Sequence, residues 1–207
     1  MVGHCIMSRN VPQPLVAGSR VYLRHPRKSD MDEFTRLVIA SRRFLHPWVN
    51  PATTPEAYER YLQLSRRKSM CACLVCRSED SGIIGVCSLS QIFFGNLRHA
   101  FLGYWIGAGF SGQGYMTEAL DLLLSYAFET LRLHGIEADI QPENVHSKAL
   151  AARIGFRMVG LFPRYLKVAG RWKDHERWAI GRKAWAEVSG KAAHDSAAIY
   201  PCSKAMR

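Results

Sequence analysis

The chain has 207 residues, a formal net charge of +11 and a hydrophobic content of 48%. This length and this content are enough for one domain with a packed core, which excludes an intrinsically disordered chain. The surplus of positive charge attracts anions such as phosphates, RNA or acidic proteins. The basic residues occur in short clusters, such as Arg24, Arg27 and Lys28, and not in a long tail. Charge alone therefore predicts no sequence-specific binding of nucleic acid.

The distribution of apolar residues gives no sign of a membrane protein or a secreted protein. No apolar run approaches the roughly 20 residues that cross a bilayer. The first apolar stretch is short and is interrupted by Arg9, Pro12 and Pro14, so we expect no signal peptide. Because the cysteines also show no disulfide framework, we predict a cytoplasmic protein that does not bind membranes.

The six cysteines raise the question of a metal site. Cys71, Cys73, Cys76 and Cys87 fall in predicted strands, where cysteine behaves as a small hydrophobic residue. Alternation along a strand places Cys76 on the face opposite to Cys71 and Cys73. No second Cys/His pair follows at zinc-finger spacing. The spacing therefore predicts no metal site.

Hydrophobic periodicity and turn residues predict one domain over residues 19–185 between two tails, 1–18 and 186–207. The domain begins with a strand over 20–24, a helix starting at Ser29 or Asp30, a turn-rich link over 41–51, and a helix starting at Thr54 and Pro55. Then come strands over 71–76, 83–89 and 100–106, a helix over about 114–132, a strand over 136–140, a helix over about 145–154, and strands near 156–168 and 172–181. This order predicts an α/β domain built around a mixed sheet.

The strand over 100–106 is apolar at nearly every position, which predicts burial on both faces. A glycine-rich loop joins it to the long helix. Glycines let a backbone approach a ligand closely, and a helix start offers free N–H groups and the positive end of the helix dipole. These features favour a pyrophosphate site, with a turn that binds nothing as the alternative. The P-loop and dinucleotide motifs do not fit, because no lysine precedes the helix and Thr117 stands where a third glycine is required.

Two segments, the loop and a second element further along the chain, together match the motifs of one known family. The loop Ser111-Gly-Gln-Gly-Tyr-Met116 resembles the acetyl-CoA loop of the GNAT superfamily of N-acetyltransferases. Further along the chain, Asn144-Val-His-Ser147 and Arg153-Ile-Gly-Phe156 resemble the Asn-x-x-Ser and Gly-Phe element of the same family.

Three more segments point to one branch of that family. Arg43–Trp48, Leu102–Ile106 and Tyr165–His175 resemble the RimJ/RimL type, the ribosomal-protein-alanine N-acetyltransferases, with the RimJ side closer. The resemblance covers roughly residues 20–182. It implies the GNAT fold: an α/β domain with a mixed, mostly antiparallel central sheet, flanking helices and splayed central strands.

The resemblance also implies the chemistry. Acetyl-CoA is the expected co-substrate, and a neutral primary amine attacks its thioester with no covalent enzyme intermediate. The expected acceptor is the N-terminal α-amine of a protein, in particular a ribosomal one. The expected partners are such a protein N-terminus or another amine acceptor, and the ribosome. The expected oligomeric state is a monomer or a homodimer.

Roles carry over to individual residues of the motifs. The predicted cofactor-binding residues are Tyr104, Trp105, Ile106, Ser111, Gly112, Gln113, Gly114, Tyr115, Met116, Thr117, Asn144 and Ser147. Ser147 is the candidate catalytic residue, protonating the leaving sulfur, and the alternative is that it only caps the helix after Asn144. Phe44, Leu45 and Trp48 are the candidate substrate-binding residues, and the alternative is that they pack the link onto the core.

The sequence departs from the family pattern in the loop and at the expected base. Ser111 replaces the opening Arg/Gln and Met116 the last small residue, but phosphate binding through backbone N–H groups tolerates both. The stretch 100–102 lacks the glutamate that many relatives carry as a base. Glu118, in the first turn of the long helix, is typical of a helix-dipole partner. Asp174 and His175 could line the amine channel or fix a turn; we assign no base from the sequence.

Two other functions fit the same motifs. One is a small-molecule N-acetyltransferase for a polyamine, an aminoglycoside or an amino acid, although no acidic cluster for a polycation stands near the link. The other is a non-catalytic acyl-CoA-binding or ribosome-binding module, which the missing glutamate leaves open. Release of CoA in the presence of amines separates an enzyme from such a module.

Overall fold

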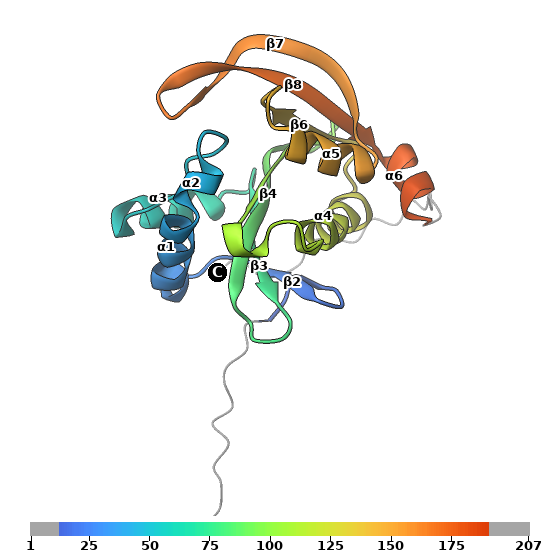
Figure 1. Ribbon diagram of the computed structural model, residues 1–207. Helices are drawn as coiled ribbons and strands as arrows, with labels where there is room; N and C mark the ends of the chain where they lie inside the picture. The colour runs from blue at the N-terminus through green and yellow to red at the C-terminus, as the bar shows by residue number, and fades with distance from the viewer. Residues whose placement is uncertain (1–12, 191–207) are drawn as a thin grey trace, which may run out of the picture.

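One eight-stranded sheet organises residues 13–190, the part of the chain that the computed structural model describes (Figure 1). Its order is β1-β2-β3-β4-β5-β6-β8-β7, and all neighbours pair antiparallel except β5 and β6, which are parallel. The strands are β1 (Val16–Ala17), β2 (Val21–Arg24), β3 (Cys71–Arg77), β4 (Ile83–Phe93), β5 (His99–Ile106), β6 (Gly135–Ile140), β7 (Arg157–Val168) and β8 (Arg171–Gly181).

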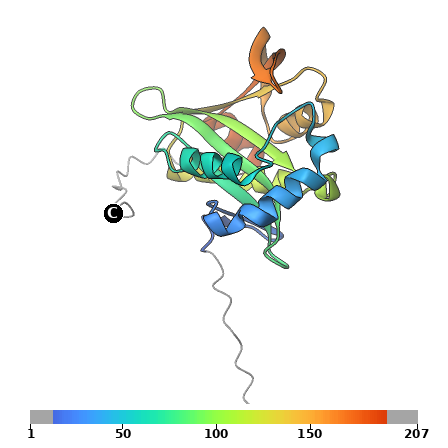
Figure 2. The ribbon, with the colours of Figure 1, turned by 90° about the vertical axis from the view of Figure 1, so that its left-hand side faces the viewer.

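Helices cover both faces of the sheet (Figures 1 and 2). They are α1 (Met31–Ala40), α2 (Arg42–Leu45), α3 (Pro55–Ser65), α4 (Tyr115–Ser125), α5 (Val145–Arg153) and α6 (Arg182–Ser189), with 3-10 turns at Lys28–Asp30 and Ala108–Phe110. Leu120 and Leu124 of α4 and Trp185 of α6 pack into a core on one face. Phe34 of α1 and Tyr58 of α3 pack into a second core on the other face. No helix in residues 13–190 combines the length and the apolar character needed to cross a membrane.

The predicted side-chain cap is present at the start of α3 but not at the start of α1. Thr54 caps α3 as predicted, because its hydroxyl accepts from the Ala57 N–H at 3.3 Å and Pro55 follows. Asp30 precedes α1, but its carboxylate does not cap that helix. It accepts instead from the Arg27 N–H at 2.7 Å and from the buried guanidinium of Arg24. Arg24 is therefore part of the interior and not of a surface cluster.

The two central strands diverge along their length. β5 and β6 are paired only from His99 and Gly135 to Phe101 and Glu137. Beyond these residues the edge of β5 has no strand partner on that side within residues 13–190, while β6 continues along β8. The predicted splay of the central strands is therefore present, and it opens the sheet where the glycine-rich loop begins.

Several elements differ from the sequence-based expectations. β1 lies inside the predicted tail 1–18, and α6 continues past residue 185, with Ala186 buried; the rest of both predicted tails lies largely outside the described residues. The helix predicted over 114–132 changes after Ser125 into a π-helix, Tyr126–Thr130. The second half of β5 is not buried on both faces: Gly103 is exposed and the next three residues are half-buried.

Candidate active site

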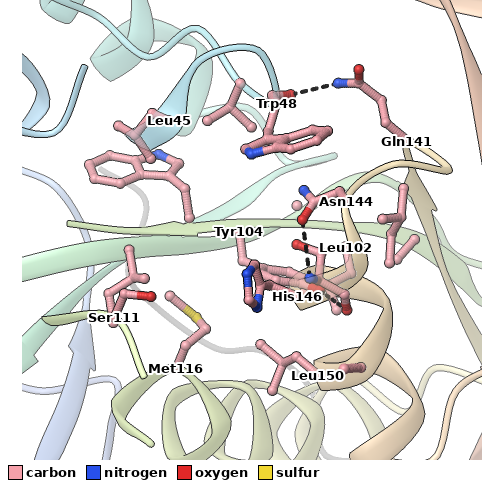
Figure 3. A pocket seen from close by; sticks show the side chains of 18 of the residues that line it. Leu45, Trp48, Leu102, Tyr104, Ser111, Met116, Gln141, Asn144, His146 and Leu150 are labelled. Carbon is pink, nitrogen blue, oxygen red and sulfur yellow. Dashed lines mark hydrogen bonds between the residues drawn. The ribbon is translucent and has the colours of Figure 1, made fainter. Parts of the chain in front are cut away.

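The half-exposed end of β5 lines a cavity of about 510 Å³. The diverging strands β5 and β6, the glycine-rich loop, the start of α4, the face of α5 and the α1–α3 link all contribute to its wall. Figure 3 shows Trp48 and Leu45 on one side of Tyr104, and Met116 and Leu150 on the other. The position of the cavity at the splay explains why β5 is not buried on both faces.

The loop that closes one end of the cavity depends on two glycines with a left-handed backbone. Gly112 has a φ of 76° and Gly114 a φ of 82°, and L side chains rarely adopt this conformation. A Cβ at Gly112 would meet no atom of the described part of the chain within 4 Å. The backbone is therefore open to a ligand at this point, next to the N-terminal N–H groups of α4, which suits a pyrophosphate.

Arg20 fastens this loop to β2. Its Nη1 donates to the Gln113 carbonyl at 3.0 Å, and its Nε donates to Glu118 Oε2 at 3.0 Å. Burial by itself would raise the pKa of Glu118, but hydrogen bonds from the Arg20 main chain and side chain, and from Val21 and Ser19, hold it below its usual value. Glu118 is therefore an anchor for the loop and not a proton acceptor.

The start of α5 forms a second wall of the cavity. Asn144 is the N-cap, and its Oδ1 accepts from the Ser147 N–H at 3.2 Å. The phenol of Tyr104 donates to the Ser147 carbonyl at 3.1 Å. Burial raises the pKa of Tyr104 to about 12, so this phenol stays protonated. The helix is thus capped by Asn144, and the Ser147 hydroxyl is not needed for the cap.

The link between α1 and α3 is held over the cavity from two sides. Gln141, directly after β6, donates its amide to the carbonyls of Pro47 and Trp48, both at 3.2 Å. Figure 3 shows the hydrogen bond to Trp48. Ser41, which is 3% exposed, accepts from the Ala108 N–H at 2.9 Å. Gln141 is 5% exposed, so these buried hydrogen bonds fix the aromatic link relative to the splayed strands.

Two polar side chains from the β6–β8 region also line the cavity. Asp139 accepts from Arg177 through both oxygens, at 2.9 and 3.3 Å. His175 is 3% exposed, and its Nδ1 lies 3.0 Å from the Lys173 carbonyl. A carbonyl oxygen only accepts, so in the neutral ring Nδ1 carries the proton and Nε2 keeps the free lone pair.

Most of the predicted site residues meet at this cavity. Its lining includes Phe44, Leu45, Trp48, Tyr104, Trp105, Ile106, Ser111, Gly112, Gly114, Met116, Thr117, Asn144 and Ser147. Two predicted cofactor residues are not part of this lining. The Gln113 side chain donates to the Gly109 carbonyl at 2.8 Å, and the ring of Tyr115 lies 5.0 Å from the guanidinium of Arg20.

Sequence reasoning missed other lining residues, among them Asp139, Gln141 and His146. Gln141 follows a short strand as an ordinary polar residue, and only its contact with a link more than 90 positions away gives it a role. The two candidates near the last hairpin, Asp174 and His175, have different roles in the structure. His175 lines the cavity, whereas Asp174 accepts from the Arg164 N–H at 2.8 Å and fixes the irregular part of β7.

Comparison with known proteins assigns this fold and site to a family. Residues 20–157 match the acetyltransferase (GNAT) domain, and the chain belongs to the GNAT family of acetyltransferases. The GNAT fold, the activity of an acetyl-CoA-dependent N-acetyltransferase and the use of acetyl-CoA that the motifs predicted are thereby confirmed.

Individual relatives include enzymes of the ribosomal branch. The chain is 29% identical over 184 residues to the ribosomal protein uS5-alanine N-acetyltransferase of Escherichia coli (strain K12), covering 85% of this chain and 95% of that protein. The structure of Mycobacterium smegmatis RimJ in complex with CoA-disulfide is similar with a TM-score of 0.72 and 30% identity, covering 83% of this chain and 90% of that one. The probable N-acetyltransferase YjcK of Bacillus subtilis (strain 168) is 41% identical over 103 residues, which span half of this chain and 57% of that relative.

Proposed function

We propose that this acetyltransferase modifies the N-terminal α-amine of a protein, with a ribosomal protein as the expected acceptor. The observation that carries the proposal is the similarity along almost the whole length of the uS5-alanine N-acetyltransferase. Association with the ribosome and a cytoplasmic location are part of the same proposal.

The polarity of the cavity supports a protein acceptor over a polyamine or an aminoglycoside. Asp139 is the one carboxylate among the cavity-lining residues within 13–190, and both of its oxygens are engaged by Arg177. A polycation needs several free carboxylates to replace its hydration. The aromatic link at Phe44 and Trp48 offers instead an apolar surface for the first side chains of a peptide.

We propose that His175 is the general base. The reaction needs a neutral amine, a stabilised oxyanion and a proton for the leaving thiolate. The free Nε2 of His175 can take a proton from the acceptor ammonium, directly or through one water, whereas Asp139 is occupied by Arg177. Backbone N–H groups near Ile106 are the proposed donors to the thioester oxygen, and Ser147 is the proposed proton donor to the leaving sulfur.

The direct test is thiol release from acetyl-CoA, corrected for hydrolysis, with a panel of amines. The panel holds peptides with the Ala- and Ser-starting N-termini of ribosomal proteins, the same peptides with a blocked N-terminus, polyamines and aminoglycosides. We expect fast release with the free peptides and none above background with the blocked ones. Release only with small amines would assign the chain to the small-molecule enzymes, and tight CoA binding without turnover on any amine would favour a binding module.

Replacing Ser147 with alanine tests the proposed proton donor. The cap of α5 should persist, because Asn144 accepts from the backbone N–H of residue 147, which alanine keeps. We expect kcat to fall about tenfold to a hundredfold, since the departing thiolate loses its hydrogen-bond donor. The Kd for CoA, measured by calorimetry, should stay close to that of the wild type. Unchanged turnover would leave Ser147 with no part in the chemistry.

Replacing Trp48 with alanine tests the acceptor wall. Gln141 holds the link through main-chain carbonyls, so the backbone of the link should keep its place without the indole. We expect KM for the peptide to rise about tenfold, which corresponds to roughly 1.4 kcal/mol of lost contact, with little change in KM for acetyl-CoA. Steady-state kinetics with each substrate varied in turn measures both values, and equal rises would assign Trp48 to packing.

A further inference from the structure

Three metal-binding side chains meet at a place that does not line the active-site cavity. Cys71 and Cys73 lie two positions apart on β3, so their side chains share one face of the sheet. His25 directly follows β2, the neighbouring strand (Figure 1). One ligand atom from each of the three residues lies within 4.8 Å of the others.

The distances fit a tetrahedral metal ion. The two sulfur atoms are 3.8 Å apart. Two thiolates bound at about 2.3 Å with a tetrahedral angle between them are separated by about 3.8 Å. The imidazole is oriented in the way that metal-binding histidines usually are, since Nδ1 of His25 lies 3.0 Å from the Ala72 carbonyl. Nδ1 then carries the proton, and Nε2 is the nitrogen left to bind a metal.

Burial and charge agree with such a site. Cys73 is fully buried and Cys71 is 6% exposed, whereas His25 is exposed. A divalent ion with two thiolates and a neutral imidazole has no net charge, so the buried side of the site would hold no uncompensated charge. The exposed histidine leaves a fourth position open to water.

We propose that His25, Cys71 and Cys73 bind one thiophilic d¹⁰ cation of the zinc type. Soft thiolates and imidazole select such an ion over magnesium or calcium. Binding releases one proton from each thiol and changes no oxidation state. The ion would link the residue that follows β2 to β3, shortly before α1 begins. Its role would therefore be structural and not part of acetyl transfer. The cysteine spacing alone predicted no site, because the proposed third ligand, His25, lies far from the cysteines in the chain, directly after β2.

The test is a metal titration of the reduced, metal-free full chain carrying Cys5→Ser and Cys202→Ser, since both of these cysteines lie outside the described residues. With Co²⁺ we expect one equivalent to produce the visible absorption bands of a tetrahedral thiolate site, and Zn²⁺ to remove them. Zn²⁺ should also raise the Tm. His25→Ala should leave the fold intact because the residue is exposed, and it should weaken Co²⁺ binding more than about tenfold. Cys71→Ser should do the same.

Cys76→Ala is the matched control, because Cys76 is buried in the same strand but packs into the core on the opposite face. It should leave the Co²⁺ bands and the metal affinity unchanged. The proposal is overturned if no tetrahedral bands appear at one equivalent, if His25→Ala binds Co²⁺ as tightly as the parent, or if Cys76→Ala loses the bands equally. In each of those cases Cys71 and Cys73 are a hydrogen-bonded thiol pair only.

Discussion

Replacing His175 with glutamine is expected to lower kcat for peptide acetylation by about a hundredfold or more, the usual contribution of a positioned general base. Glutamine is polar and similar in size, but it cannot accept a proton at neutral pH. The Kd for CoA should stay close to that of the wild type, so that the loss of rate is not a loss of cofactor binding.

His146→Gln is the matched control for this prediction. His146 lines the same cavity, but it is exposed near the start of α5. It should retain most of the wild-type kcat, and both variants should bind CoA as the wild type does. A His175→Gln enzyme with the wild-type kcat would remove His175 from the chemistry, and a larger loss of kcat in His146→Gln would assign the role of the base to His146.

The parts of the site that the sequence predicted are formed by residues that are consecutive in the chain. The loop from Ser111 to Thr117 needs glycines at fixed places before a helix, and α5 begins where the sequence predicted it, although Asn144 and not Ser147 supplies the cap. Local rules for turns and helix starts describe both. The same holds for the start of α3 at Thr54 and Pro55, where the cap and the proline agree.

The parts that the sequence did not predict depend on pairs of residues far apart in the chain. Gln141 matters because two carbonyls of the link face it across the splay. The amphipathic pattern after Ser125 fits an α-helix and a π-helix equally, since both turn an apolar stripe toward the sheet. β5 is apolar for two different reasons, burial at Ala100 and the cavity from Leu102 onward, and an apolar run does not separate them.

The environment of Arg24 differs from the one its sequence context predicts, because Arg24 stands in a basic cluster and yet is 4% exposed. Its Nη1 and Nη2 donate to the two oxygens of Asp30 at 2.7 and 2.9 Å. Burial alone would lower the pKa of Arg24, but the hydrogen bonds and charge of Asp30 raise it above its usual value. The pair joins the end of β2 to the turn that begins α1, and both side chains are nearly closed to water.

Replacing Arg24 with methionine should therefore destabilise the protein by about 3–5 kcal/mol, because it leaves the Asp30 carboxylate buried with only the Arg27 N–H as a partner. For a domain of this size that loss lowers Tm on the order of 10 °C, measurable by calorimetry. Asp30→Asn added to Arg24→Met should recover part of the loss, because the buried site then holds no charge. Lys28→Met removes an exposed pair with Glu59 and should change stability by less than about 0.5 kcal/mol. If Arg24→Met behaves like Lys28→Met, the pair does not hold the exit of β2 in place.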